Sequence, residues 1–556
     1  MNLNRFLNGV GVLVLVGAAF ASAGCSGSSG STGGSTGTGG STGTGGSTGT
    51  GGSSGGTTGD TGKSGANPPA DPSGLIITRA DKGEIDLSWT ASATASVTYT
   101  LQRAPVGGTF SDLQTELTGT TYSDTAIDPY TDYVYAVQAV SAGGTSIYAK
   151  TAHPGGPPPV GFQLAAALPA GAASGQDVGE ALSMVLDENG DPALAYVFVD
   201  PGSDDDLAPS ALEFVSWNRK DFVWSAPVKV DTVGPVDATD RDRQVSLARD
   251  ASTGTLAIAY QRATLVSGGD TQYEIKLALS TDRGTTWTTQ TAMPATSGPA
   301  YDPSLAVKDG TAYLAFDLLG TEVKYATGSL TADPSTWTVQ TAPTLTGAGT
   351  PIATGASLAL DGAGNPALAY WLDSDADDND ALAFWRPGMS SPVKVTDTAN
   401  NYNGVLNASL AFFGTKPRIA LFAVRDATES DKNVWVTASD DGATWSNPVQ
   451  LPGDHSASMS PSVWLALDAQ GRAAVVNDSN SSTGDQACGT PKLSRSADLL
   501  SWTTCSPDTD NTQNLSSSVA GFNVARFAGN DKLYIATMTD TEDASLGRGL
   551  VVWREP

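Results

Sequence analysis

Histidine and cysteine are scarce in this sequence, whose 556 residues include two histidines and three cysteines. Metal sites built from imidazole or thiolate ligands therefore lack their usual material, and we expect any metal site to use oxygen ligands. Positive charge is also scarce, because 30 basic residues stand against 58 acidic ones and the formal net charge is -28. A surface of this sign repels phosphate backbones, so we expect no nucleic-acid partner.

Long apolar runs are missing as well. The run "VGVLVLVGAAFA" follows Arg5 and is too short to span a bilayer comfortably, so residues 1–24 are predicted to be an export signal. The following "SAGC" resembles a bacterial lipobox, which implies that Cys25 carries a diacylglycerol anchor in the cell envelope, in the outer membrane or at the cell surface. Ser22 departs from the usual Leu, Val or Ile of that motif. The alternative is an ordinary secretory peptide with an incidental cysteine.

Residues 25–68 are almost entirely Gly, Ser and Thr. Such a segment buries too little apolar area to offset chain entropy, so we predict a disordered tether. It would hold the following domains roughly 35 Å from its anchor, by the random-coil estimate.

Residues 69–153 carry short alternating strands, with Ile85, Leu87 and Trp89 on one face. The stretch "IDPYTDYVYAVQAVSAGG" resembles the fibronectin type III pattern. The resemblance implies a β-sandwich in which Tyr133 is the corner tyrosine that bonds back to the main chain. Tyr135 departs from the aliphatic residue that is usual two positions later.

Beyond a Pro-rich hinge at residues 154–161, an internal repeat runs to residue 556. Seven segments such as "SLALDGAGNPALAY" begin at Ser183, Ser246, Ser304, Ser357, Ser409, Ser462 and Asn523. Each unit reads as four strands, which is the pattern of a β-propeller blade. We therefore predict an all-β protein with a seven-bladed propeller over residues 162–556.

The last unit stops after its third strand, "GLVVWRE", whereas "GFQLAAALPAG" precedes the first unit as an unattached strand. We predict that this N-terminal strand completes the last blade and closes the ring, because closure removes exposed sheet edges. Six blades with one peripheral repeat is the alternative.

The segment "STDRGTTW" matches the Asp-box pattern of sialidase-like propellers at Ser280, Asp282, Gly284 and Trp287. A near-copy, "ASDDGATW", places Asp440, Gly442 and Trp445 in the same roles, and "SRSADLLSW" is a weaker one. Because the motif recurs between third and fourth strands, we interpret it as a structural turn and not as an active site. The resemblance implies the fold more than the activity.

Sialidases clamp their substrate with three arginines and use a Tyr-Glu pair and an acid/base Asp. Four arginines near strand ends are candidates for a divergent clamp, namely Arg241, Arg243, Arg262 and Arg425. No Arg-Ile-Pro motif is present. The alternative is that these arginines are surface or salt-bridged residues.

Loops between second and third strands are acidic in several units. They would favour a cation or a basic ligand. The segment "DSDADDND" places Asp373, Asp375, Asp377 and Asp380 as possible Ca2+ ligands, although Asp378 and Phe384 depart from the EF-hand pattern. A solvated acidic loop is the alternative.

Cys488 and Cys505 flank one predicted hairpin, so we predict a disulfide. Taken together, the sequence favours a monomeric, membrane-anchored binding or adhesion lipoprotein whose propeller recognises a glycan, protein or peptide through an acidic face. A divergent sialidase-like glycosidase and a purely structural envelope component are the alternatives.

Overall fold

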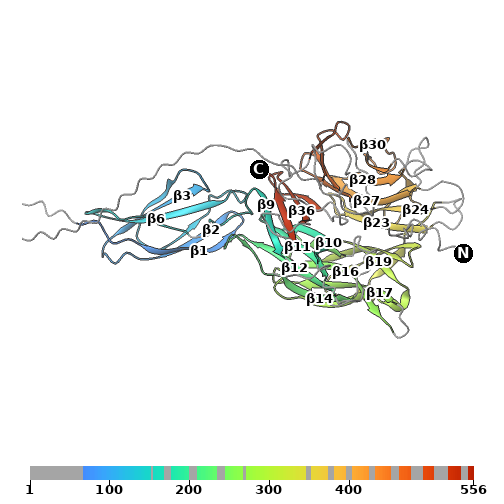
Figure 1. The fold of residues 1–556 in the computed structure, drawn as a ribbon, viewed down its shortest axis with the longest axis horizontal. Coiled ribbons are helices and arrows are strands. Elements are labelled where there is room, and N and C mark those ends of the chain that lie inside the picture. Colours follow the sequence, from blue (N-terminus) through green and yellow to red (C-terminus); the bar gives the residue numbers. More distant parts are fainter. Residues whose placement is uncertain are drawn as a thin grey trace, which may run out of the picture. The chain divides into compact units, whose positions relative to one another are not determined.

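A computed structural model describes most of the chain beyond residue 66. The described ranges are 67–151, 154–167, 177–199, 210–234, 245–266, 271–345, 352–373, 381–395, 404–424, 432–452, 463–477, 492–505, 524–539 and 549–556. Figure 1 shows a fold built almost wholly of strands, with two short 3-10 turns, η1 (Ala295–Ser297) and η2 (Pro334–Thr336). None of the helices in these ranges is both long and apolar enough for a membrane span.

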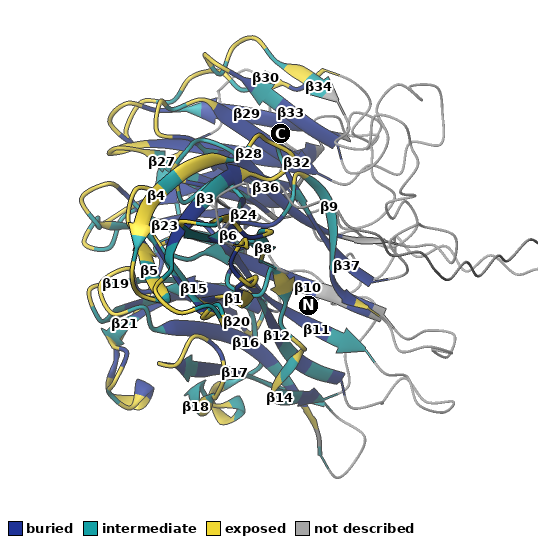
Figure 2. Ribbon diagram, turned by 90° about the vertical axis from the view of Figure 1, so that its left-hand side faces the viewer, coloured by how far each residue is buried: buried dark blue, intermediate teal, exposed yellow. Residues whose placement is uncertain are grey.

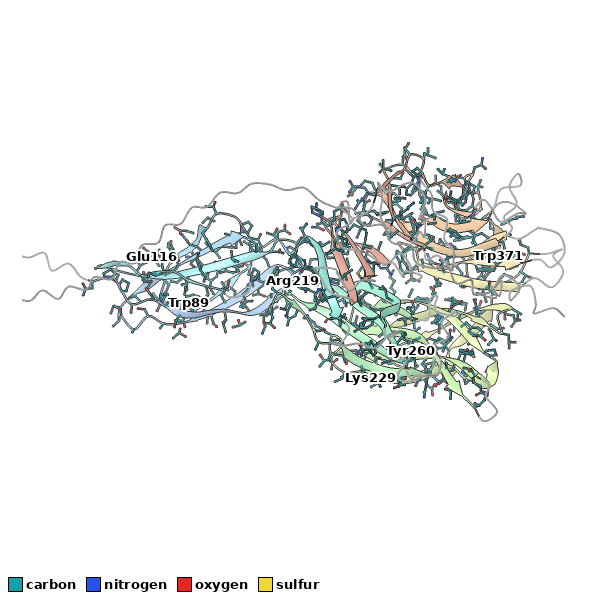
Figure 3. All side chains as sticks on the ribbon, in the orientation of Figure 1. Trp89, Glu116, Arg219, Lys229, Tyr260 and Trp371 are labelled. Carbon is teal, nitrogen blue, oxygen red and sulfur yellow. The ribbon has the colours of Figure 1, made fainter. Side chains whose placement is uncertain are left out.

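Two sheets form the first folded segment. One contains β1 (Ser73–Asp81), β2 (Glu84–Thr90) and β5 (Thr121–Asp124). The other contains β3 (Thr98–Pro105), β4 (Ser111–Leu117), β6 (Tyr133–Ser141), β7 (Gly144–Thr145) and β8 (Ala149–Lys150). Alternating side chains of both sheets meet in one core, where Trp89 contacts Tyr99 edge to face (Figure 3). The Asp128 N–H donates to Tyr133 Oη at 3.3 Å, which is a bond to the main chain of the kind predicted for a corner tyrosine.

Seven further sheets follow residue 160 in the described part of the chain, and we number them 1 to 7. Sheet 1 contains β10 (Asp177–Leu186), β11 (Pro192–Val199), β12 (Ser210–Asn218), β13 (Val223–Trp224) and β14 (Val228–Gly234). Sheet 2 contains β15 (Val245–Arg249), β16 (Leu256–Leu265), β17 (Thr271–Ser280) and β18 (Thr288–Met293). Sheet 3 contains β19 (Ala300–Lys308), β20 (Thr311–Leu318), β21 (Glu322–Ser329) and β22 (Thr338–Thr341).

The remaining sheets repeat this order. Sheet 4 contains β23 (Ile352–Leu360), β24 (Pro366–Asp373), β25 (Ala381–Trp385) and β26 (Val393–Lys394). Sheet 5 contains β27 (Gly404–Phe413), β28 (Lys416–Val424), β29 (Lys432–Ala438) and β30 (Val449–Gln450). Sheet 6 contains β31 (Val463–Leu467), β32 (Ala473–Asn477), β33 (Lys492–Ser496) and β34 (Thr503–Cys505). Sheet 7 contains β35 (Val524–Phe527), β36 (Leu533–Thr539), β37 (Gly549–Arg554) and β9 (Gly161–Ala167).

The hydrophobic core of these sheets is divided into seven clusters, each lying between two neighbours. One cluster joins sheets 1 and 2, and the others follow in turn until the last joins sheet 7 to sheet 1. The second strand of each sheet is covered on both faces, which explains nearly continuous apolar runs such as that of β11. Figure 2 shows these strands as buried ribbons. The arrangement is a closed β-propeller ring, in which β9 pairs with β37 to complete sheet 7.

A serine ladder links the first strands of successive sheets. The hydroxyl oxygen of the repeated serine accepts the main-chain N–H of a leucine in the next sheet, at 2.9 to 3.0 Å in five cases: Ser183 from Leu247, Ser246 from Leu305, Ser304 from Leu358, Ser357 from Leu410 and Ser409 from Leu465. In sheet 6, Leu465 takes the position of that leucine. The residue of sheet 6 that corresponds to the ladder serine is therefore Trp464, and not Ser462 as the comparison of the repeats suggested.

Candidate functional site

Eight of the site residues predicted from the sequence lie outside the described residues. This holds for Cys25, Arg241, Arg243, Asp375, Asp377, Asp380, Arg425 and Cys488. Asp373 and Cys505 end their strands, but their side chains are not described. Within the part of the chain that the structure does describe, no group of three or more His, Cys, Asp or Glu side chains is placed to hold a metal ion. The lipid anchor, the calcium site and the disulfide stay predictions.

Arg262 is the one predicted clamp arginine that the structure describes. It lies on β16, and its Nη1 is 3.6 Å from Glu274 Oε1 on the neighbouring strand β17. The pair is partly exposed, so it contributes little to stability. This contact matches the salt-bridge alternative for Arg262.

Among the described residues, Tyr196 and Glu213 form a Tyr-Glu pair, but its position argues against a nucleophile. Tyr196 Oη donates to Glu213 Oε2 at 2.7 Å across β11 and β12. Burial, together with the charge of Glu213, raises the pKa of Tyr196, which keeps its hydroxyl protonated. The same repeat position holds Tyr260, which bonds to Asp231, and Tyr370, which bonds to a main-chain carbonyl (Figure 3). A side chain repeated in several sheets anchors the core of each.

The Asp-box turn of sheet 2 is held by its own carboxylate. Asp282 Oδ1 accepts the Thr286 N–H at 2.9 Å, and Asp282 Oδ2 accepts the Thr286 hydroxyl at 2.6 Å. These bonds, with that from the Ser280 hydroxyl, lower the pKa of Asp282 to about 2. Gly284 adopts a φ of 87°, where an added Cβ would lie 2.1 Å from Phe214. Trp287 packs edge to face on the same phenyl ring.

In sheet 5 the corresponding carboxylate is Asp441, which corrects the prediction of Asp440. Asp441 accepts the Thr444 N–H at 2.8 Å and the Ser439 hydroxyl at 3.1 Å. Asp440 instead lies 3.2 Å from Lys416 Nζ and 3.3 Å from Arg418 Nη2. In sheet 2 one residue separates Asp282 from Gly284, whereas in sheet 5 Asp441 directly precedes Gly442. The residue whose carboxylate accepts the turn amides is therefore one position later than predicted. The turn of sheet 6 repeats the geometry with Ser496 and Asp498.

A cavity of about 530 Å³ lies between sheets 6 and 7, and we call it the junction cavity. Its walls carry three basic and three acidic side chains: Arg472, Arg495, Lys532, Asp468, Asp531 and Glu555. They come from the turns between first and second strands and from the ends of the third strands. Phe527, the last residue of β35, adds an aromatic face.

Two of the three basic side chains of the junction cavity are paired with its acidic side chains. Arg472 bonds to Asp468 and lies 3.7 Å from Asp531, while Arg495 Nη2 lies 2.9 Å from Glu555 Oε1. Lys532 donates to a main-chain oxygen of Pro556. The cavity therefore offers many hydrogen-bond donors and acceptors with no net charge, which suits a neutral polar ligand.

Sequence reasoning missed these residues because it looked to the acidic loops. A signal was nevertheless present, since third strands end in "FWRP", "LSRS" and "VWRE". The three segments contain Arg386, Arg495 and Arg554. Repetition of a charged residue at an otherwise apolar strand end marks it for a specific contact.

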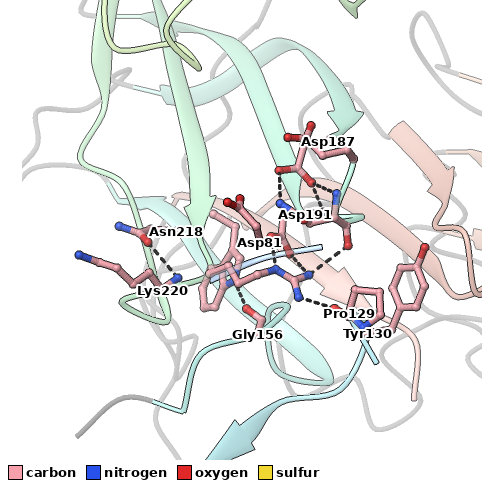
Figure 4. Close-up of polar contacts among 12 residues, drawn as sticks. Asp81, Pro129, Tyr130, Gly156, Asp187, Asp191, Asn218 and Lys220 are labelled. Carbon is pink, nitrogen blue, oxygen red and sulfur yellow. Dashed lines mark hydrogen bonds and ion pairs between the residues drawn. The ribbon is translucent and has the colours of Figure 1, made fainter. Parts of the chain in front are cut away.

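Two arginines of the propeller bind main-chain carbonyls near the first folded segment. Arg219 forms a two-pronged ion pair with Asp191, at 2.6 and 2.8 Å, and donates to the carbonyl of Pro129. Figure 4 shows these contacts. Arg554 donates to the carbonyl of Tyr130 at 2.7 Å. Both arginines are buried, so their hydrogen bonds hold this contact firmly.

No protein-family model matches the chain, and no curated protein matches it in sequence. Among solved structures, an alpha-L-arabinanase of Penicillium chrysogenum in complex with arabinobiose is 13% identical, over 71% of this chain and 97% of its own, with a TM-score of 0.39. A lectin of Burkholderia pseudomallei is 10% identical over 79% of this chain and 100% of its own, also with a TM-score of 0.39. A Fn3-like protein of Clostridium thermocellum is 32% identical, over 16% of this chain and 96% of its own, with a TM-score of 0.14.

Proposed function

We propose that this chain is a surface-anchored binding protein of the bacterial envelope, whose propeller recognises a glycan or polypeptide without cleaving it. The observation that carries the proposal is the junction cavity. Its charged groups are already neutralised by partners within the protein, and an aromatic ring lies beside them. Such a surface can exchange hydrogen bonds with a neutral polar ligand, whereas acid/base catalysis needs a titratable group poised against a reacting atom.

The rest of the chain serves this binding head. Cys25 is the lipid anchor, and residues 25–68 are the tether. Residues 69–153 are a fibronectin type III spacer, and the seven sheets are seven blades. The pairing of β9 with β37 supports the seventh blade. The two facing sheets of β1 to β8 support the spacer.

The proposal also gives a binding role to the acidic loops between second and third strands. These loops lie outside the described residues, and four of them carry several aspartates or glutamates in sequence. Their charge would admit a basic protein surface or a cation more readily than an anionic sugar.

The test compares the full chain with a Phe527→Ala variant on arrays of neutral oligosaccharides, acidic oligosaccharides and short peptides. We expect a set of bound probes whose signal falls roughly tenfold in the variant, because an aromatic contact is worth about 1.5 kcal/mol. Equal signals for both proteins on every probe would contradict a ligand site in the junction cavity.

The glycosidase alternative has its own readout. It requires an arginine cluster and a Tyr-Glu pair in one pocket, whereas Tyr196 of the described Tyr196–Glu213 pair occupies a core position that holds a tyrosine in other sheets as well. We expect no release of fluorophore from a fluorogenic sialoside. Turnover by the full chain would overturn the binding-only proposal.

A further inference from the structure

Three sheets carry an arginine at the same position. Arg495 lies opposite Ala474, and Arg554 lies opposite Tyr534. Each of these partners is the second residue after the turn that joins the first two strands of its sheet. Arg386 directly follows β25 in the same register. The three arginines therefore face three equivalent grooves, between sheets 4 and 5, 6 and 7, and 7 and 1.

The groove between sheets 7 and 1 is filled by polypeptide. Arg554 Nη2 donates to the carbonyl of Tyr130 at 2.7 Å, and Arg554 Nη1 donates to the carbonyl of Pro158 at 2.6 Å. Asp132 lies 3.6 Å from the same guanidinium. The arginine thus binds one main-chain carbonyl from each of two segments, around Tyr130 and around Pro158, that lie outside the seven sheets.

The same groove accepts an aromatic ring. Tyr130 lies between the turns of sheets 1 and 7, where a Cβ on Gly190 would come within 2.8 Å of its Cε1. A Cβ on Gly529 would come within 2.2 Å of its hydroxyl oxygen. Glycine at both places makes room for the ring, so the two turns form a slot for an aromatic side chain.

The groove between sheets 4 and 5 is closed by its own arginine. Arg386 Nη1 lies 2.9 Å from Asp361 Oδ2, and its guanidinium stacks 5.1 Å above the ring of Phe412. This cation–π contact occupies the apolar floor.

The groove between sheets 6 and 7 is the junction cavity, and it is open. Phe527 holds the floor position that Phe412 holds between sheets 4 and 5. Arg495 pairs with Glu555 at the wall and does not stack on this ring. The junction cavity therefore has an arginine at its wall and an aromatic ring at its floor. In the groove between sheets 7 and 1, by contrast, Tyr130 fills the corresponding space.

We propose that the junction cavity binds an extended polypeptide segment of a partner protein. Arg495 donates to a main-chain carbonyl of the segment, as Arg554 donates to the carbonyl of Tyr130 in the next groove, and Phe527 packs against a prolyl or aromatic side chain. This inference rests on the proposed binding function and names its ligand class. The paired charges of the cavity match a main chain, which carries donors and acceptors but no net charge.

The test uses a blocked peptide with the sequence of residues 127–133, IDPYTDY, titrated into the full chain by calorimetry. The chain's own copy of this segment occupies the groove of Arg554 at a high effective concentration, so the free peptide reports on the junction cavity. We expect binding that weakens roughly tenfold or more in Arg495→Gln, because a charged donor to a carbonyl is lost. Ala497→Trp lies at the exposed rim of the cavity and should abolish peptide binding by blocking entry. This second variant tests the inference even if Arg495→Gln does not fold.

Arg386→Gln is the matched control, because it changes the equivalent arginine in a groove that is already closed. We expect it to leave peptide affinity unchanged. Absence of peptide binding up to millimolar concentration, or binding that Ala497→Trp does not affect, would overturn the inference. If a neutral oligosaccharide binds in its place and Ala497→Trp blocks it, the polypeptide inference fails while the proposed binding function stands. If neither probe is sensitive to Ala497→Trp, both fail at this cavity.

Discussion

Single carboxylates hold the turns of this propeller, and Asp282 is the most strongly perturbed of them. Its pKa of about 2 lies below the ordinary value of 3.8, because Thr286 and Ser280 donate hydrogen bonds to the ionised form. A group with a lowered pKa in the folded state contributes stability above its unfolded pKa and loses it as the pH falls through the folded value. For Asp282 this window runs from about pH 4 down to about pH 2.

We therefore expect Asp282→Asn to lower the melting temperature at pH 7, and the difference from the wild type to shrink as the pH falls from 4 towards 2. Thr286→Val is the companion variant. It removes one hydrogen-bond donor to the carboxylate, so the pKa of Asp282 should rise in this variant. The pH at which the ionised carboxylate ceases to stabilise the fold should therefore be higher in Thr286→Val than in the wild type. Calorimetric melting across this pH range measures both effects. A difference between Asp282→Asn and wild type that stays constant from pH 5 to pH 2 would show that the ionised carboxylate does not stabilise the turn.

At the scale of elements, the serine ladder explains why a polar residue recurs at the start of otherwise apolar first strands. Ser409 is nearly buried, and its hydroxyl satisfies the N–H of Leu465 in the next sheet. An unpaired buried N–H costs about 1 to 3 kcal/mol, so this hydrogen bond stabilises the junction of the two sheets. The serine therefore fixes the spacing of neighbouring sheets as well as the strand in which it lies.

Ser409→Ala is expected to destabilise sheets 5 and 6 by about 1 to 2 kcal/mol, because it leaves the Leu465 N–H without its acceptor. Hydrogen exchange of the peptide that contains Leu465 should accelerate, and the melting temperature should fall. Ser73→Ala, at an exposed position of β1, is the control and should change neither. Unchanged exchange at Leu465 in Ser409→Ala would mean that the ladder bond contributes nothing to stability.

Local patterns predicted the strands well because the alternation of apolar and polar residues that marks a strand depends only on the residues of that strand. Ile85, Leu87 and Trp89 are all buried, as their spacing indicated. The junction cavity was beyond this reasoning. Whether Arg495 stacks on a ring, as Arg386 does, or pairs with Glu555 depends on residues that the chain brings together from separate units. The shift from Asp440 to Asp441 had a similar origin, since one missing residue in the turn changes which carboxylate reaches the amides.

For the whole molecule, ring closure depends on a strand that is remote in sequence from the sheet it completes. Residues 161–167 form the outer strand of sheet 7, and the register places Ala167 opposite Gly549. Gly549 lies so close to this strand that an added Cβ would be 2.0 Å from the carbonyl oxygen of Ala166. The close approach lets the first and last strands of the propeller pair, which covers the edge of β37.

Gly549→Val should break this pairing, because its side chain cannot share the space of that carbonyl. The exposed edge of β37 would then offer free N–H and C=O groups to other molecules. We expect a lower melting temperature and self-association that increases with protein concentration in analytical ultracentrifugation. Gly119→Val, at a site with open space around the added side chain, should remain monomeric and melt like the wild type. A monomeric Gly549→Val protein with an unchanged melting temperature would show that the ring holds together without the β9–β37 pair.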